Sequence, residues 1–348
     1  MSPQSSEHES ETLHPRSNTL LFGHGAAEQA MLEAYRSGRL PHAFLLAGPQ
    51  GIGKATLAYR MARFVLAYPD PAAAEVAAAT SLAVDAGHPV ARRMAAQAQG
   101  DLLILERTPN DKGVLRQQIA VDDVRRTVSF FGSTAGEGGW RIAVLDAVDE
   151  LNASSANALL KVLEEPPQRA LLLLVSHSAA RVLPTLRSRC RIVTLRPLAE
   201  ADVGAAAAAA TGRAADELDL LAAAAAAEGS VARAVALLDE DALALRQQAL
   251  DLLDGLPRLD PNALHALGDA LAGSDPKPLA SFVDTVNAWL SRRLDRESEA
   301  RSESVRLVRL AEVWERINTA AADALTYNLE RRPFIFSVFG LLAEATRG

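Results

Sequence analysis

The sequence predicts an α/β domain with a parallel five-stranded sheet and flanking helices, followed by a small helical domain and a larger all-α domain. Three observations predict it: five strand-sized apolar runs before residue 197, helical spacing between them, and alanine-rich segments after residue 198. Because strands alternate with helices, the sheet should be parallel and covered on both faces. The five runs begin at Ala43, Asp101, Arg141, Ala170 and Arg191.

The domain limits follow from shifts in composition. We expect a flexible N-terminal tail over residues 1–19, the α/β domain over 20–197, a small helical domain over 198–255 and a larger helical domain over 256–348. Alanine is the strongest helix former, so the alanine runs after residue 198 indicate packed helices. Pro257 and Pro261 interrupt the helical pattern near the last boundary. The charged stretch 295–303 is expected to be a loop between two amphipathic helices.

Composition narrows the class of protein. The chain has 348 residues, a formal net charge of -7 and a single cysteine, Cys190. This charge does not favour general binding to nucleic acid, and one thiol can form neither an internal disulfide nor a four-cysteine zinc site. The first twenty residues are polar, unlike a signal or transit peptide, and no stretch predicts a membrane span. We therefore expect a cytoplasmic protein.

A phosphate-binding loop follows the first predicted strand. Its candidate residues are Gly48, Gly51, Gly53 and Lys54, and a helical pattern comes directly after them. Glycines allow successive backbone N–H groups to face a phosphate, the helix presents its positive end, and the lysine adds a charge. The strand, loop and helix context makes this the strongest motif in the chain.

The groups needed for hydrolysis are missing around this loop. Such loops place Ser or Thr after the lysine to hold Mg²⁺, and here that residue is Ala55. Thr56 is a weak substitute, because one residue along a helix rotates the side chain by about 100°. The third run ends in Asp146, at the position of the acidic residue that attends the metal, but Ala147 follows it. The sequence thus predicts nucleotide binding without efficient hydrolysis and names no confident metal ligand.

Two further acidic residues lie just beyond. Asp149 and Glu150 form an alternative acidic pair, but using them would bury Asp146 inside a parallel strand. We therefore expect Asp149 and Glu150 to be a solvated helix start.

Three segments together resemble a known family. They are RLPHAFLLAGPQGIGKATLAYRMARFVL, AVLDAVDELNASSANALLKVLEEPP and LPTLRSRCRIVTLRPL, in this order. They resemble the bacterial DNA polymerase III clamp loader, an AAA+ family, and are most similar to its delta prime subunits. The likeness covers roughly residues 20–240 by motif.

The resemblance implies an AAA+ module, a lid and a collar domain that joins a five-subunit ring. In that family an arginine within a Ser-Arg-Cys motif acts as an arginine finger in the nucleotide site of a neighbouring motor subunit. The matching residues here are Ser188, Arg189 and Cys190. The implied partners are the gamma/tau and delta subunits, the beta sliding clamp and, through the assembled ring, primer-template DNA. No cofactor is required, and weak binding of ATP or ADP is expected.

Other positions depart from the motor subunits of this family. Motors carry a lid arginine one residue before Arg233, where this chain has Ala232, and they insert a four-cysteine zinc module where this chain has only His88. His177 follows the fourth run, near the position of a phosphate sensor, but a structural loop histidine is the preferred interpretation. Cys190 is expected to pack as a small apolar residue.

The leading hypothesis is a ring stator that lends an arginine to its neighbour and has little or no ATPase of its own. One alternative is an active gamma/tau-like motor, which Ala55 and Ala147 disfavour. Another is a small-molecule P-loop kinase, but the segment after residue 198 lacks the arginine-rich lid typical of that class.

Overall fold

A computed structural model of the chain describes residues 14–107, 119, 121–132, 139–151, 153–238, 240–273, 276–299, 304–326 and 329–346. Contacts between residues divide the chain into two units, Met1–Val235 and Ala236–Gly348. Each unit is described by itself. The predicted division into a tail, an α/β domain, a lid and a collar stays a prediction.

The first unit contains a parallel sheet of five strands in the order β2-β3-β4-β1-β5. Each strand lies where an apolar run predicts it, so the α/β fold class is confirmed. The strands are β1 (Ala43–Ala47), β2 (Leu102–Glu106), β3 (Arg141–Asp146), β4 (Ala170–Ser176) and β5 (Arg191–Thr194).

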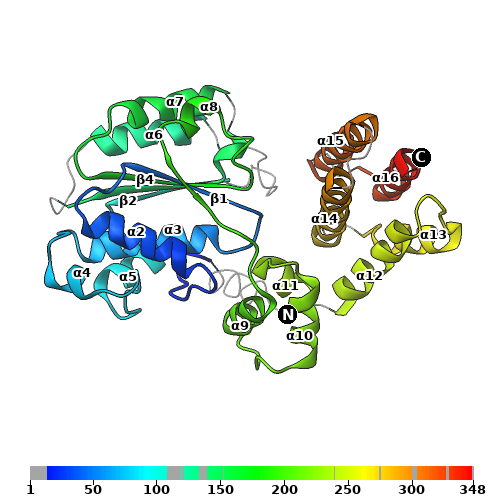
Figure 1. Ribbon diagram of the computed structural model, residues 1–348, viewed down its shortest axis with the longest axis horizontal. Helices are drawn as coiled ribbons and strands as arrows, with labels where there is room; N and C mark the ends of the chain where they lie inside the picture. The colour runs from blue at the N-terminus through cyan, green and yellow to red at the C-terminus, as the bar shows by residue number, and fades with distance from the viewer. Residues whose placement is uncertain are drawn as a thin grey trace. The chain divides into compact units, whose positions relative to one another are not determined.

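Helices cover both faces of this sheet, as Figure 1 shows. Successive residues of β1 pack on opposite faces: Phe44 and Leu46 join one buried core and Leu45 joins the other. Burial on both sides explains why the central strands β1 and β4 are almost entirely apolar. One face carries α2 (Gly25–Arg36), α3 (Lys54–Ala67), α4 (Ala74–Ala78) and α5 (Pro89–Ala95). The other carries α6 (Val121–Gly132), α7 (Ala153–Glu164) and α8 (Pro184–Arg187).

The segment between α3 and β2 is held by hydrogen bonds to α2. The backbone N–H of Leu82 donates to Glu28 Oε1 over 2.9 Å, and Arg36 Nε donates to the carbonyl of Val76 over 3.2 Å. His88 caps α5, because its Nδ1 accepts a hydrogen bond from the N–H of Val90 at 3.2 Å. His88 therefore has a structural role in this segment.

The lid segment of the first unit consists of three helices after β5. The alanine runs fall within its first two helices, as predicted, and small side chains let these helices approach closely around Val203, Leu198 and Ala224. The helices are α9 (Glu200–Thr211), α10 (Leu218–Ala226) and α11 (Val231–Ala236).

The second unit is built from helices around one apolar core, to which Phe282, Val286, Trp289 and Leu290 contribute as their spacing predicts. α12, which falls inside the predicted lid domain, contributes Leu253 to this core. The helices are α12 (Glu240–Asp254), α13 (Pro261–Ala270), α14 (Pro276–Glu299), α15 (Ser304–Thr326) and α16 (Arg331–Thr346).

The expected loop over 295–303 is wrong for its first part. α14 continues to Glu299, and residues 300–303 lie outside the described part of the chain. Arginine and glutamate are good helix formers and the stretch contains neither Gly nor Pro, so charge alone does not end the helix.

Within the described ranges, no helix combines the length and the apolar character needed to cross a bilayer.

Candidate functional site

The carboxyl edge of the sheet brings the predicted loop and the acidic residues together. Ala47 at the end of β1 is level with Ser176 on β4, and Asp146 at the end of β3 is level with Val175. Glu106 at the end of β2 is level with Asp146. Polar groups after four neighbouring strands thus meet where ligands bind in open α/β sheets.

The glycine loop has the backbone conformation that its sequence predicts. Gly51 and Gly53 have φ of +76° and +99°, which side chains of L-residues rarely allow. A Cβ at Gly51 would also lie 2.3 Å from Ser230 Oγ on the lid segment. Lys54 begins α3, so its ammonium and the positive end of that helix face the same cavity.

Three carbonyl groups of this loop are held by donors from different parts of the unit. Lys54 Nζ donates to the carbonyl of Pro49 over 2.5 Å, and His24 Nε2 donates to that of Ile52 over 2.7 Å. The backbone N–H of Ala232 donates to the carbonyl of Gly51 over 3.3 Å. These hydrogen bonds fix the backbone of the loop, whose N–H groups can then bind an anion.

Lys54 is 3 % exposed. Burial lowers the pKa of its ammonium to about 8, although the charges of Asp146 and Asp149 oppose this effect. A buried cation that bonds to a carbonyl is a site for a phosphate, because an anion would stabilise its charged form.

Asp146 lies in the cavity, as the sequence predicts, and its pKa is raised by burial and by the charges of Glu106 and Asp149, with Lys54 opposing. Glu106 has a lowered pKa, chiefly because His14 hydrogen-bonds to it. The negative charge beside the loop is therefore shared among several carboxyl groups.

The expectation of a solvated Asp149 is wrong. This residue lies in a short 3₁₀-helix, η1 (Val148–Glu150), is 9 % exposed, and its Oδ1 accepts a hydrogen bond from the N–H of His177 at 3.0 Å. Its Oδ2 is buried without a hydrogen-bond partner. The tight turn after β3 directs the carboxylate toward the end of β4 instead of toward solvent. The side chain of Glu150 lies outside the described residues.

His177 lines the cavity, and burial together with the charge of Lys54 lowers its pKa. Its backbone bond to Asp149 agrees with the structural role expected for it, while its position at the cavity adds a polar surface there.

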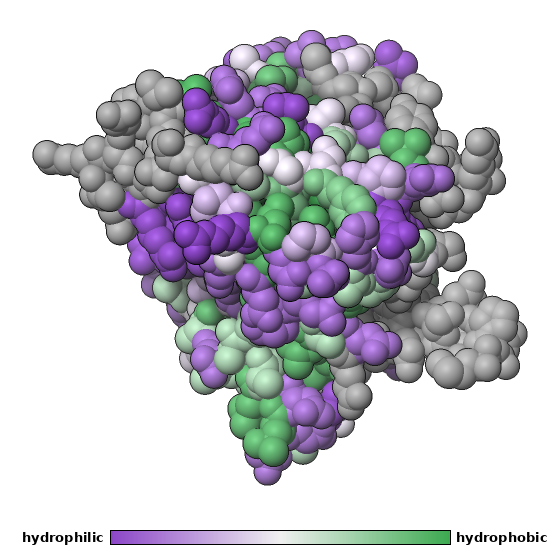
Figure 2. All heavy atoms as spheres, turned by 90° about the vertical axis from the view of Figure 1, so that its right-hand side faces the viewer, coloured by the Kyte–Doolittle hydropathy of each residue, from purple (hydrophilic) through white to green (hydrophobic). Residues whose placement is uncertain are grey.

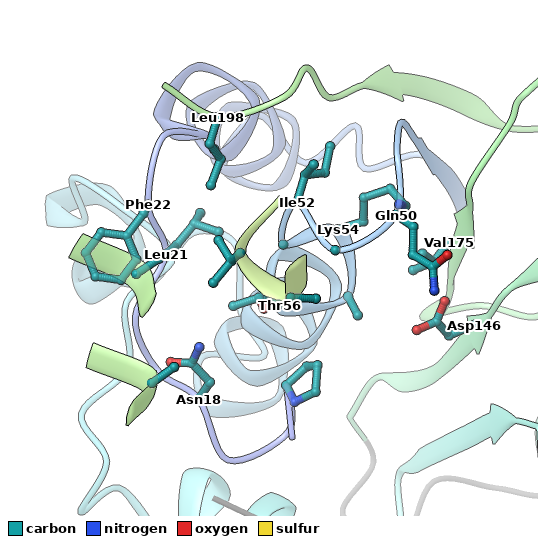
Figure 3. Close-up of a pocket in the computed structure, with 18 of the residues that line it drawn as sticks. Asn18, Leu21, Phe22, Gln50, Ile52, Lys54, Thr56, Asp146, Val175 and Leu198 are labelled. Carbon is teal, nitrogen blue, oxygen red and sulfur yellow. The ribbon is translucent and has the colours of Figure 1, made fainter. Parts of the chain in front are cut away.

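Cavity walls around the loop come from the α/β domain, the lid segment and the N-terminal segment. The cavity has a volume of about 700 Å³, and Ala55, Thr56 and Ala147 all line it. Figure 3 shows apolar side chains such as Leu21, Phe22 and Leu198 at one end and Gln50 and Asp146 at the other. The cavity therefore has an apolar end suited to a base and a charged end suited to phosphates.

The structure places no metal-ligand cluster here. Across the described ranges, no group of three or more His, Cys, Asp or Glu side chains is arranged to hold a metal ion. Ala55 and Ala147 present methyl groups to the cavity, and Asp146 carries the nearest predicted metal-attending carboxylate. The loop and Lys54 thus fit the phosphates of a nucleotide.

The lid segment contributes Ala232 to the cavity wall. The adjacent Arg233 forms an ion pair of 2.8 Å with Glu228.

The N-terminal segment is the part of the site that the sequence does not reveal. Pro15 and Asn18 line the cavity, although they fall within the predicted tail, and residues 1–13 lie outside the described part of the chain. Arg63 on α3 donates to the carbonyl groups of Arg16 and Asn18 at 2.8 and 3.2 Å. Arginines spaced one helical turn apart on α3 are the only sequence signal for this contact.

The predicted finger lies apart from the cavity-lining residues, just after α8. The side chain of Arg189 is 36 % exposed, and its guanidinium forms an ion pair of 2.9 Å with Glu164. Cys190 packs against the core beneath, and burial raises its pKa to about 11, as expected for a packing residue.

Comparison with known proteins places these features in a family. The model of the family described as "DNA polymerase III, delta subunit" matches residues 23–199, about half of the chain. The chain belongs to the DNA polymerase III delta-subunit family. This matched range contains the phosphate loop, all five strands and the Ser-Arg-Cys motif, so the resemblance read from the motifs is confirmed.

Several relatives of this delta-subunit family member have curated names. The chain is 40% identical to a Pseudomonas aeruginosa protein named DNA polymerase III subunit delta', over 43% of this chain and 41% of the relative. It is 33% identical to a Yersinia pestis protein of the same name, over 47% of this chain and 44% of that relative. A Buchnera aphidicola protein named DNA polymerase III subunit gamma is 28% identical, over 54% of this chain and 47% of that relative. The chain thus matches less than half the length of each of these relatives.

Proposed function

We propose that the chain acts as the delta prime subunit of a DNA polymerase III clamp loader. In this role it joins gamma/tau and delta subunits in a cytoplasmic ring that loads the sliding clamp onto primed DNA. The proposal is supported by the family match and by relatives named subunit delta' at up to 40% identity. Relatives named subunit gamma or gamma/tau are 28% and 29% identical.

One observation carries the mechanistic part of this proposal. Alanine occupies three positions around the cavity where a motor needs polar groups: Ala55, Ala147 and Ala232. A hydroxyl ligand for Mg²⁺, a carboxylate that orients water and a lid arginine are therefore absent together. The subunit binds a nucleotide and does not turn it over efficiently.

The remaining groups determine how the nucleotide is held. The loop N–H groups, Lys54 and the N-terminus of α3 hold ATP or ADP phosphates, and the apolar end of the cavity receives the base. Because Ala55 supplies no hydroxyl ligand after Lys54, affinity does not depend strongly on Mg²⁺.

Arg189 acts outside its own chain. A guanidinium is charged at every physiological pH and forks across two phosphate oxygens, which suits it to neutralise charge that develops at a neighbour's nucleotide. Arginine fingers supplied in trans raise hydrolysis rates by roughly 10³ to 10⁵ in other nucleotide switches. The exposed position after α8 lets this side chain reach a partner.

The test uses the full chain alone and in a ring reconstituted with gamma/tau and delta subunits. The isolated chain should show negligible ATP hydrolysis, and Arg189→Ala should slow DNA-stimulated hydrolysis by rings that still assemble. Arg191→Ala, a change at a nearby exposed arginine, is the matched control. Magnesium-dependent turnover by the chain alone would instead support the motor alternative, and phosphate transfer to a small acceptor would support a kinase.

A further inference from the structure

The guanidinium of Arg189 is engaged by its own chain. Nη2 lies 2.9 Å from Glu164 Oε1, and Nη1 donates to the carbonyl of Thr185 at 2.9 Å and to Ser188 Oγ at 3.3 Å. Both terminal nitrogens are therefore occupied. A phosphate needs the same donors, because carboxylate and phosphate oxygens bind the guanidinium fork in the same way.

Helix electrostatics single out Glu164 among these partners. It is the last residue of α7, where the negative end of the helix dipole disfavours a carboxylate. Arg189 provides the opposite charge directly against it. With the two side chains 36 % and 50 % exposed, the pair contributes little to folding stability, so stability does not account for an acidic residue at this position.

We propose that Glu164 is a positioning residue that holds Arg189 back from a partner's nucleotide. This inference rests on the finger role proposed above and adds its regulation. In the free chain the carboxylate neutralises the guanidinium. When a neighbour presents nucleotide phosphates, the phosphates replace Glu164 as the partner of Arg189, and the charge becomes available at the neighbour's site.

The size of the effect follows from the exposure of the pair. An exposed ion pair has only a small interaction free energy, and binding to the phosphates must break this pair. Removing the competing carboxylate should therefore tighten binding to a nucleotide-loaded partner by about two- to fivefold. A partner without nucleotide offers no phosphates, so its affinity should not change. High salt should reduce the difference, because it screens the intramolecular pair.

The experiment compares Glu164→Gln with Glu165→Gln, a change at the adjacent exposed glutamate. Affinity of the full chain is measured for the motor subunit loaded with a non-hydrolysable ATP analogue and for the motor without nucleotide. Glu164→Gln should increase the affinity for the nucleotide-loaded motor and leave the affinity for the empty motor unchanged. Glu165→Gln should change neither affinity. Glu164→Asp, with a shorter side chain, should behave like Glu164→Gln. In an Arg189→Ala background, Glu164→Gln should have no effect.

Unchanged or weaker binding by Glu164→Gln would overturn the inference, as would an equal gain in the Arg189→Ala background. The finger itself has a separate readout. A ring with Arg189→Ala that hydrolyses ATP at the full rate would refute the proposed function. The remaining outcome is that the Arg189→Ala ring hydrolyses ATP slowly while the Glu164 variants bind the loaded motor with unchanged affinity. That outcome would refute only the role of Glu164 in holding back Arg189.

Discussion

Nucleotide affinity should depend on pH through Lys54. In the free protein burial lowers the pKa of this ammonium to about 8, and a bound phosphate raises it by opposing charge. Because the pKa of Lys54 rises on binding, its ammonium contributes fully to the free energy of nucleotide binding below about pH 8. This contribution is lost as the pH increases above that value. At pH 9 about one Lys54 in eleven is protonated in the free protein, so affinity should be about tenfold lower than at pH 7.

The assay is calorimetric titration with ADP between pH 7.5 and 9.5 without Mg²⁺. This window lies above the titration of the terminal phosphate, near pH 6. Burial lowers the pKa values of His24 and His177, so neither titrates in this window. At pH 8, titrations in buffers of different ionisation enthalpy should show uptake of about half a proton per nucleotide.

Two variants complete the design. Lys54→Arg keeps its charge throughout the window, so its affinity should not depend on pH. Lys161→Ala removes an exposed lysine of α7 and should leave the wild-type profile unchanged. An affinity for ADP that is the same at pH 7.5 and 9.5 in the wild-type chain would refute the reasoning, because the buried ammonium would then not contact the phosphates.

Three other substitutions test the site and its support. Gly51→Ala should weaken nucleotide binding and lower the free energy of unfolding by more than Gly38→Ala, because both have positive φ but only Gly51 faces the lid segment closely; equal losses would exclude the lid contact. Glu28→Gln should cost about 3 kcal/mol in urea unfolding, because it leaves a buried arginine without its counter-ion, whereas Glu33→Gln on the same helix should cost little. Ala55→Ser should make nucleotide affinity depend on Mg²⁺, and titrations that match with and without the metal would contradict the missing-ligand argument.

The sheet and the loop could be predicted because their signals are local. Each strand coincides with a short apolar run, and burial on both faces makes the central strands β1 and β4 almost entirely apolar. The loop is defined by glycine spacing and by Lys54, which begins a helix as expected. Parallel register then places Asp146 beside the loop without further information.

The features that could not be predicted depend on tertiary contacts. Asp149 is buried because the turn after β3 aims it at the backbone of His177, and nothing in the local sequence specifies that direction. Glu106 joins the site only because β2 lies beside β3. The charged residues at the end of α14 do not mark its boundary, because arginine and glutamate are good helix formers.

The attachment of residues 16–18 to Arg63 has a practical consequence for work on this chain. Truncating the first twenty residues for biochemical work would also remove part of the cavity wall, because Pro15 and Asn18 line it. Such a shortened protein would report a nucleotide affinity that belongs to an opened site. Any shortened version of the chain therefore needs to keep Pro15 and Asn18.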